Sequence, residues 1–358
     1  MPTFQHAQLL EMGRQILTGA GVSEAEADIV ASELADANLV GHDSHGVMRL
    51  VQYVEFIRDG YAKPGMAAEV VEEGPTFAVV DGHFNFGQVT TRLALNLGMK
   101  KAKENGTATV LIRNCNHIGR LGAYTHEAAL NGLIAMMAVN APGPGGVAPF
   151  GGIERRLGTN PISIAAPAGS DALVLDMTTS ATAEGKLRVS KQKGEMVGEG
   201  LIIDGYGHPS CDPNAYYNKP FGSILPLGGT SMGHKGFGLS VMIDVLCGIL
   251  SNSGVCRTDL PRGANGVWMQ FFEVERFLPR ADYDRWMGTY LESIKGCPRL
   301  PGVNEIYMPG EIERRTRERR LREGVDVPAE TWRQLLELAT SLNVDLTLLL
   351  AGEEQTEA

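Results

Sequence analysis

Apolar residues recur at helical spacing through the first sixty positions of the chain. Leu9, Met12 and Ile16 fall on one face of such a helix. Ser23, with Glu26 three residues later, forms a capping box, which is a common start of a helix. The pattern predicts three helices, which cover residues 4–19, 23–41 and 47–60.

From position 76 onward the pattern changes to short apolar runs that alternate with amphipathic stretches. Runs rich in Val, Ile and Leu that are closed by turn residues are typical of buried strands. The alternation of strands and helices predicts an α/β domain. The stretch 185–222 shows neither period and is expected to be mostly loop and turn. Strands are expected at residues 77–82, 107–114, 133–140, 162–167, 172–177 and 265–273. Helices are expected at residues 87–105, 236–250, 281–294, 311–324 and 328–342, and one more is expected to follow the loop of His117 and to end at Gly132.

The composition narrows the class of protein. Of the 358 residues, 43% are hydrophobic and 21% are charged, which is the balance of a globular protein with a sizeable core. The formal net charge of -10 opposes a nucleic-acid partner, because a negative field repels phosphate. The five cysteines form no CxxC pair, which favours reduced thiols in the cytoplasm. The sequence shows neither a signal peptide nor an apolar run of about 18 residues, so no membrane span is expected.

The stretch from Gly41 to Leu50, GHDSHGVMRL, concentrates reactive side chains at the end of a helix. It holds two histidines, an aspartate, a serine and an arginine. An imidazole can move a proton, a hydroxyl can orient it, and a guanidinium can bind a carboxylate. The alternative is a polar loop that caps the preceding helix. His42 and His45 lack the further ligands of a zinc site, such as an HExxH pattern, so no metal is expected.

Three further stretches combine the end of an element with reactive side chains. His117 follows a buried strand, where ligands gather in α/β sheets, although a loop histidine bonded to backbone fits equally well. Residues 176–180, DMTTS, close another strand and fit either a ribose-binding turn or an ordinary Asx turn. Lys235 lies in GGTSMGHKGFG, directly before an expected helix, which favours an anion-binding loop over a plain flexible one. Neither GxGxxG nor GxxxxGK[ST] occurs, so a classical Rossmann or P-loop nucleotide site is not supported.

Taken together, these stretches resemble the malate/L-lactate dehydrogenase family of NAD(P)-dependent 2-hydroxyacid oxidoreductases. This family is distinct from the Rossmann-type lactate dehydrogenases, and it includes ureidoglycolate, sulfolactate and cyclic-imine (piperideine or pyrroline-2-carboxylate) members. The motifs follow the family order and cover nearly the whole chain, which makes their combination specific. The matching motifs are DSHGVMRL (43–50), DGHFNFGQV (81–89), NHIGRLGAY (116–124), VAPFGG (147–152), GTNPISIAAP (158–167), LDMTTS (175–180), GHKGFGL (233–239) and PGVNEIYMPGE (301–311).

The resemblance implies an α/β fold with a mixed sheet, no classical Rossmann fingerprint and an N-terminal helical segment. It also implies a homodimer and a nicotinamide cofactor, NAD or NADP. The chain would divide into a helical substrate-site segment (1–75), an α/β cofactor-binding and catalytic region (76–300), and a cofactor-contacting C-terminal segment whose helices pack back on the body (301–358). The residues implied around the substrate are Ser44, His45, Arg49 and His117, and either histidine could be the acid/base. The residues implied near the cofactor are Asn140, Ala141, Asp176, Met177, Thr178, Lys235, Pro309, Gly310 and Glu311.

The implied reaction is reversible hydride transfer between the cofactor and C2 of a small 2-hydroxy or 2-oxo acid, with Arg49 binding the carboxylate. Two alternatives remain, which are reduction of cyclic or N-alkyl imino acids and a non-catalytic nicotinamide-binding regulatory protein. The chain departs from the family in the glycine-rich loop after Asn140 and at Glu184, where an arginine is usual. A carboxylate that approached the adenosine ribose would favour NAD, because it accepts from a free 2′-OH and repels a 2′-phosphate.

Overall fold

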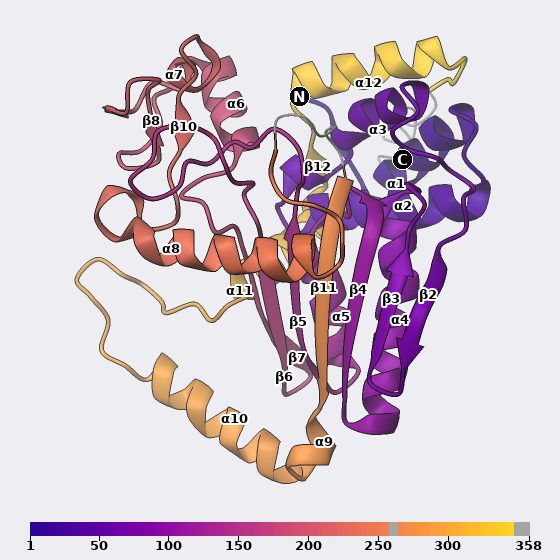
Figure 1. Ribbon diagram of the computed structural model, residues 1–358, viewed down its shortest axis with the longest axis vertical. Coiled ribbons are helices and arrows are strands. Elements are labelled where there is room, and N and C mark those ends of the chain that lie inside the picture. The colour runs from indigo at the N-terminus through magenta and orange to yellow at the C-terminus, as the bar shows by residue number, and fades with distance from the viewer. Residues whose placement is uncertain (258–263, 347–358) are drawn as a thin grey trace, which may run out of the picture.

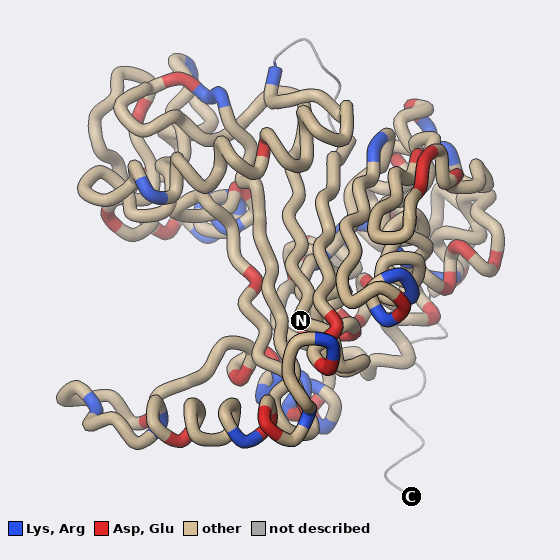
Figure 2. The backbone as a smooth tube through the Cα atoms, turned by 60° about the horizontal axis from the view of Figure 1, so that its bottom comes forward, with Lys and Arg blue, Asp and Glu red and all other residues tan. Residues whose placement is uncertain are grey.

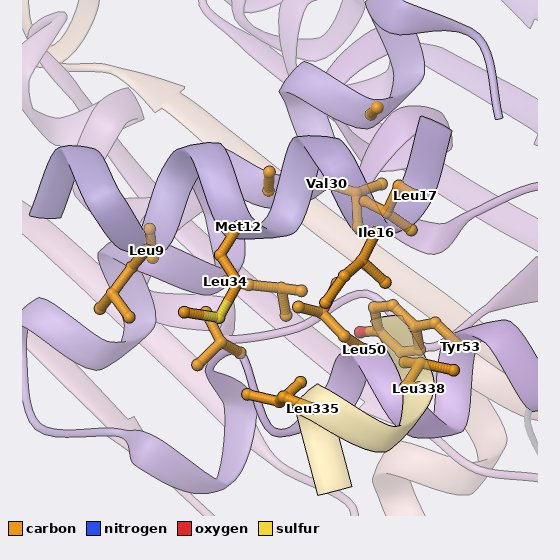
Figure 3. Packing of buried hydrophobic residues seen from close by; sticks show 14 of the residues in the cluster. Leu9, Met12, Ile16, Leu17, Val30, Leu34, Leu50, Tyr53, Leu335 and Leu338 are labelled. Carbon is orange, nitrogen blue, oxygen red and sulfur yellow. The ribbon is translucent and has the colours of Figure 1, made fainter. Parts of the chain in front are cut away.

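A layer of helices forms one end of the molecule. The expected N-terminal helices are confirmed as α1 (His6–Gly19), α2 (Glu24–Leu39) and α3 (Arg49–Arg58). They pack around one apolar core, because their leucines, isoleucines and valines repeat on the faces that meet. α12 (Ala329–Ser341), from the far end of the chain, closes the same core with two leucines (Figure 3). The layer therefore joins the two ends of the described chain.

The computed structural model describes residues 1–257 and 264–346, so residues 347–358 of the expected C-terminal segment lie outside it. The strands are β1 (Thr3–Phe4), β2 (Glu69–Gly74), β3 (Phe77–Asp81), β4 (Thr107–Asn116), β5 (Leu133–Asn140), β6 (Ile162–Ala168), β7 (Asp171–Met177), β8 (Ile202–Ile203), β9 (Pro209–Ser210), β10 (Ser223–Ile224), β11 (Ala264–Glu273) and β12 (Val325–Asp326). The remaining helices are η1 (Asp43–His45), α4 (Gly87–Asn105), α5 (Leu121–Leu130), α6 (Glu184–Lys193), α7 (Asn214–Tyr217), α8 (Gly229–Ile243), η2 (Asp244–Ile249), α9 (Val274–Phe277), α10 (Arg280–Lys295) and α11 (Glu311–Glu323).

A seven-stranded sheet forms the centre of the molecule, in the order β2-β3-β4-β11-β5-β6-β7. Within this sheet β3 and β4 run parallel, and the other neighbouring strands run antiparallel. β11 lies between β4 and β5 and pairs with both, although it comes much later in the sequence. The α/β fold with a mixed sheet is therefore confirmed.

Helices cover both faces of this sheet (Figure 1). α4 and α5 lie behind the strands in that view, and Leu95, Tyr124 and Phe271 are buried in the core between them and the sheet. α8 crosses the front of the sheet and continues as the π-helical segment η2. β4 ends at Asn116, whose side-chain amide donates to the backbone oxygen of Tyr61 (3.1 Å). This hydrogen bond connects the end of β4 to the segment that follows helix α3.

The stretch 185–222 is mostly loop and turn, as expected, but it also holds most of helix α6, the short helix α7 and the strands β8 and β9, which were not expected. α6 lacks an apolar stripe, because Leu187 alone among its apolar side chains is fully buried, so its helical period is hidden in the sequence.

The glycine-rich stretch around Lys235 is part of helix α8 and not a loop before it. α8 begins at Gly229, and Gly229 and Gly236 allow close packing against neighbouring backbone. A Cβ on Gly236 would lie 2.5 Å from the backbone oxygen of Leu227, so a larger residue would collide with the turn that leads into the helix. The proposed anion-binding helix start at Lys235 is therefore corrected, since Lys235 lies in the second turn of α8.

α10 extends away from the body as an arm at the bottom of Figure 1. Acidic and basic residues are interspersed along the chain rather than separated into large single-sign areas (Figure 2). None of the helices in the described part of the chain is both long enough and apolar enough to cross a membrane.

Candidate active site

The short turn η1 carries the first group of candidate residues, and two helices hold it in place. The Asn38 side chain of α2 donates to Asp43 Oδ1 (2.7 Å) and accepts from the Val47 backbone N–H (2.8 Å). Arg320 of α11 donates to both carboxylate oxygens of Asp43 (2.7 and 3.1 Å). A Cβ on Gly46 would lie 2.1 Å from Asn38 Oδ1, so glycine is needed there. The turn is therefore held by α2, which precedes it in the sequence, and by α11, which lies near the C-terminal end of the described chain.

Ser44, His45 and Arg49 lie together at this turn. Ser44 Oγ is 3.1 Å from His45 Nδ1. Arg49, in the first turn of α3, donates from Nε to the backbone oxygen of Ser44 (2.6 Å) and from Nη1 to Gln52 Oε1 (2.6 Å). Both acceptors are neutral, so the charge of Arg49 has no carboxylate partner among the described residues. A guanidinium in this position is suited to binding an anion.

His117 lies directly against His45. The two ring centroids are 5.5 Å apart, and the rings are nearly parallel at 23°. His117 Nδ1 is 2.7 Å from the hydroxyl of Tyr53, which accepts from Gln88 Nε2 (2.7 Å). Tyr53 and Gln88 are fully buried. The tyrosine hydroxyl can donate to or accept from Nδ1, so it holds the ring in either protonation state and leaves Nε2 for another partner.

The electrostatic surroundings keep both histidines neutral near pH 7. Burial lowers the pKa of His45 to about 3, and the positive charge of Arg49 acts in the same direction. Burial also lowers the pKa of His117 well below its usual value, again with help from Arg49. Burial raises the pKa of Tyr53 to about 12, so its hydroxyl stays protonated. A neutral imidazole is ready to accept a proton, and an anion bound at Arg49 would raise the pKa of both histidines.

We expect the stability of the protein to fall as the pH drops below about 6.5. Between pH 6.5 and 3 an unfolded His45 binds a proton and the folded one does not, so protonation favours unfolding. The loss at pH 5 is up to about 2 kcal/mol for this histidine, at 1.36 kcal/mol per pH unit. Melting curves of His45→Asn between pH 7.5 and 5 should show a smaller decrease than wild type. His208→Gln, at an exposed histidine, is the control, and an equal decrease in all three proteins would contradict the expectation.

A first cavity, of about 840 Å³, opens beside these residues. Ser44, Arg49 and Gln52 line one wall, and Glu184 and Arg188 of α6 line another. The outer wall comes from α12. Glu184 therefore faces the cavity of the candidate substrate residues.

A second cavity, of about 590 Å³, lies between α2, α5, β7 and α11. Asp176 at the end of β7 and Gly310 before α11 both line it. Asp176 accepts from the Gly122 backbone N–H (2.7 Å), and burial raises the pKa of its carboxyl group. Arg120 also lines this cavity, and its buried Nε has no hydrogen-bond partner among the described residues. Arg120 follows His117 by three residues, and its charge contributes to the lowered pKa of His45, so the second cavity lies within electrostatic reach of His45.

Pro309 and Glu311 flank Gly310 at the second cavity. The Pro309 backbone oxygen accepts from the Val174 N–H (3.1 Å). Glu311 accepts from the Met308 N–H and pairs with Lys295 Nζ (2.6 Å) at the end of the arm. Both residues therefore anchor the loop beside Gly310.

The other candidates near the cofactor lie apart from these residues. The Asn140 side chain donates to Asp244 Oδ1 (2.9 Å) and joins β5 to η2. The Thr178 hydroxyl bonds to the Ser180 backbone, next to half-buried Met177. Ala141 and Lys235 are exposed and line neither cavity.

Sequence reasoning missed several residues of the site. Tyr53 lies on the apolar face of α3 and Gln88 in α4, where each is indistinguishable from a core residue by spacing. Arg120 and the pair Asp43–Arg320 become visible only when segments far apart in sequence meet. One signal existed for Tyr53, since it stands one helical turn after Arg49 and shares its face.

Two stacked neutral histidines beside the Arg49 guanidinium can bind a small anion and exchange a proton with it. A family model described as malate/L-lactate dehydrogenase matches residues 4–336. Malate dehydrogenase of Pyrococcus horikoshii is 38% identical over 92% of this chain and 93% of that protein. A putative malate/lactate dehydrogenase from E. coli superposes with a TM-score of 0.92 at 31% identity over 100% of both chains. The delta1-piperideine-2-carboxylate reductase of Pseudomonas syringae pvar. tomato gives 0.81 at 27% identity over 95% of this chain and 100% of that chain.

The chain belongs to the malate/L-lactate dehydrogenase family. It is a dehydrogenase that acts on 2-hydroxy acids with a nicotinamide cofactor.

Proposed function

We propose that the protein interconverts a malate- or lactate-like 2-hydroxy acid and its 2-oxo acid at the His45–His117 pair. The observation that carries this proposal is the stacking of the two neutral rings beside Arg49, which forms no ion pair with a described carboxylate. Arg49 binds the substrate carboxylate, which points C2 and its oxygen toward the rings. The malate dehydrogenase name of the Pyrococcus horikoshii relative supports this substrate class.

His117 is the proposed proton-transferring group. Its Nδ1 is occupied by Tyr53, so Nε2 takes the hydroxyl proton during oxidation and returns it during reduction. Tyr53 is held by the buried Gln88, which makes the ring orientation rigid. His45, held by Ser44, hydrogen-bonds the C2 oxygen from the neighbouring side. The bound carboxylate offsets the charge of Arg49 and raises the pKa of the histidine, as a general base requires.

The second cavity fits the cofactor. Arg120 offers a buried Nε–H that no described residue accepts, and Gly310 offers backbone that carries no side chain. The cofactor carries the hydride chemistry when bound, and the proposed residues hold it next to the histidine pair. Glu184 lies in the other cavity, so its proposed effect falls on the substrate rather than on the ribose.

A substrate panel tests the function. Purified protein is mixed with NADH or NADPH and with pyruvate, oxaloacetate or a cyclic imino acid, and the loss of nicotinamide absorbance is followed. Oxidation of NADH with a 2-oxo acid is expected. Turnover of the imino acid alone would favour the imine-reductase alternative, which the Pseudomonas syringae neighbour supports at lower identity. Binding of NADH without turnover of any compound would favour a regulatory protein.

A homodimer is proposed from the exposed apolar surface of α8 and η2. Met242, Ile249 and Leu250 are more than half exposed there. Trp286 and Tyr290 are equally exposed on the arm helix α10. Large exposed apolar surfaces of soluble proteins are commonly covered by a second subunit, and a two-fold dimer would pair this face with its copy.

We expect Met242→Glu to convert the dimer to a monomer, because the substitution places two like charges in an apolar contact. Light scattering after size-exclusion chromatography measures the mass. Met196→Glu is the matched control, since Met196 is a similarly exposed methionine in the loop after α6. A wild-type mass of one chain at micromolar concentration, or a dimer that survives Met242→Glu, would refute the proposed interface.

The cellular location and the division of the chain into segments are also proposals. The five cysteines are free thiols, which supports a location in the reducing cytoplasm. The division into segments 1–75, 76–300 and 301–358 stays a proposal, and the shared core of the first segment with α12 supports the contact between the first and last segments.

A further inference from the structure

The first cavity carries an arginine on two of its walls, and Glu55, Glu184 and Glu337 also line it. Arg49 extends from α3 on the wall that carries Ser44. Arg188 extends from α6 on another wall, one helical turn after Glu184. The walls meet at Gly185, where an added Cβ would lie 3.4 Å from the Cβ of Ser44. A small ligand at Ser44 would therefore lie between the two arginines.

Arg188 is held in position by a short chain of contacts. Its Nη2 donates to Glu184 Oε2 (2.8 Å), and Tyr217 donates its hydroxyl proton to Glu184 Oε1 (2.9 Å). The ion pair is exposed, with 45% of the Arg188 side chain and 39% of the Glu184 side chain accessible. Exposed pairs between residues i and i+4 are weak, so the guanidinium can turn its other N–H groups to a ligand. Glu184 thus orients Arg188 but accepts a hydrogen bond only from its Nη2, so the other guanidinium N–H groups can bind a ligand.

The two arginines also influence each other. Burial lowers the pKa of Arg49, and the charge of Arg188 acts in the same direction, while Glu184 opposes it. Two cations that share a cavity repel, and an anion between them relieves the repulsion. Arg333 pairs with two carboxylates, Glu330 and Glu337, and Arg58 donates to Ser341, whereas Arg188 pairs with Glu184 alone among the described residues. Arg49 and Arg188 are thus the pair suited to hold the two ends of one ligand.

We propose that Arg188 binds a second anionic group at the distal end of the substrate. The preferred substrates are then 2-hydroxy and 2-oxo acids of three or four carbons that carry a further carboxylate or sulfonate. This proposal rests on the proposed function, with the C1 carboxylate at Arg49. Glu184, which stands where the family usually has arginine, holds Arg188 in place for this role.

Arg188→Gln tests the proposal, since it removes the charge and keeps a hydrogen-bonding side chain. We expect kcat/KM for oxaloacetate to fall roughly 10- to 100-fold, mainly through KM, which is the usual effect of losing a charge-assisted hydrogen bond. kcat/KM for pyruvate should stay within about twofold, because pyruvate lacks the second anion. Arg188→Lys should recover part of the loss. Lys191→Gln is the matched control, because Lys191 is one turn further along α6, lies over the Tyr217 ring and does not line the cavity.

The outcomes separate this proposal from the proposed function. Equal losses for both acids, no loss for oxaloacetate, or a wild-type preference for pyruvate would overturn the role of Arg188. A parallel rise in KM for NADH would also overturn it, since Arg188 would then contact the cofactor. Failure of the wild-type protein to reduce any 2-oxo acid would instead refute the proposed function itself.

Discussion

Replacing His117 by asparagine should lower kcat for reduction of a 2-oxo acid by roughly 10²–10⁴-fold, the usual contribution of a general acid/base. Asparagine keeps a polar side chain but provides no group that exchanges a proton near neutral pH. The KM for the acid should change little, because Arg49 still binds its carboxylate. Steady-state rates at saturating NADH and saturating 2-oxo acid measure the effect.

His83→Asn is the matched control for this variant. His83 contacts Glu69 and Asp81 in a loop that lines neither cavity. Its backbone has φ 46, a conformation that asparagine adopts readily, so the fold should be kept. The His117 assignment would be refuted if His117→Asn kept more than a tenth of the wild-type kcat. It would also be refuted if His45→Asn lost more activity than His117→Asn, since the proton would then be transferred by His45.

Replacing Arg49 by lysine should raise KM for the 2-oxo acid by roughly 10- to 100-fold, because lysine keeps the charge but loses the planar fork that binds a carboxylate at two points. The variant also loses the bonds to the Ser44 backbone and to Gln52, so Ser44 is less well positioned. Arg49→Leu should lose more, since the charge is removed as well. Initial rates over a range of acid concentrations at fixed NADH give KM and kcat separately.

Arg58→Lys is the comparison for Arg49→Lys. Arg58 lies on the same helix and lines the same cavity, but it donates to Ser341 of α12. Its KM values should match those of wild type. An unchanged KM in Arg49→Lys, or an equal change in both variants, would exclude Arg49 as the carboxylate-binding residue.

Helical and strand periodicity predicted most elements of the fold, because most helices and strands have one buried and one exposed face, and their apolar residues repeat at the period of the element. α1, α2 and α3 were predicted from their apolar stripes, and α2 also from its Ser23 cap, which accepts from the Glu26 N–H. α6 was not predicted, because it buries little apolar surface. The insertion of β11 between β4 and β5 was not predicted either, because strand order depends on contacts between segments distant in sequence.

The candidate site was predictable where several polar residues stand close together in sequence. Ser44, His45 and Arg49 come from one ten-residue stretch, and the structure brings His117 against them. Tyr53 and Gln88 were not predictable, since a buried tyrosine and glutamine are recognised as functional only through their bonds. Lys235 was misjudged because glycines that allow close helix packing resemble glycines of a phosphate-binding loop.

Transfer of deuterium from labelled cofactor tests the central claim most directly. The protein is incubated with NADH carrying deuterium at both C4 positions and with pyruvate or oxaloacetate, and the hydroxy acid formed is analysed by mass spectrometry and NMR. The proposed function predicts one deuterium, located on C2 of the product, whichever face of the nicotinamide is used. A hydroxy acid without deuterium at C2, or no hydroxy acid from either 2-oxo acid, would contradict it.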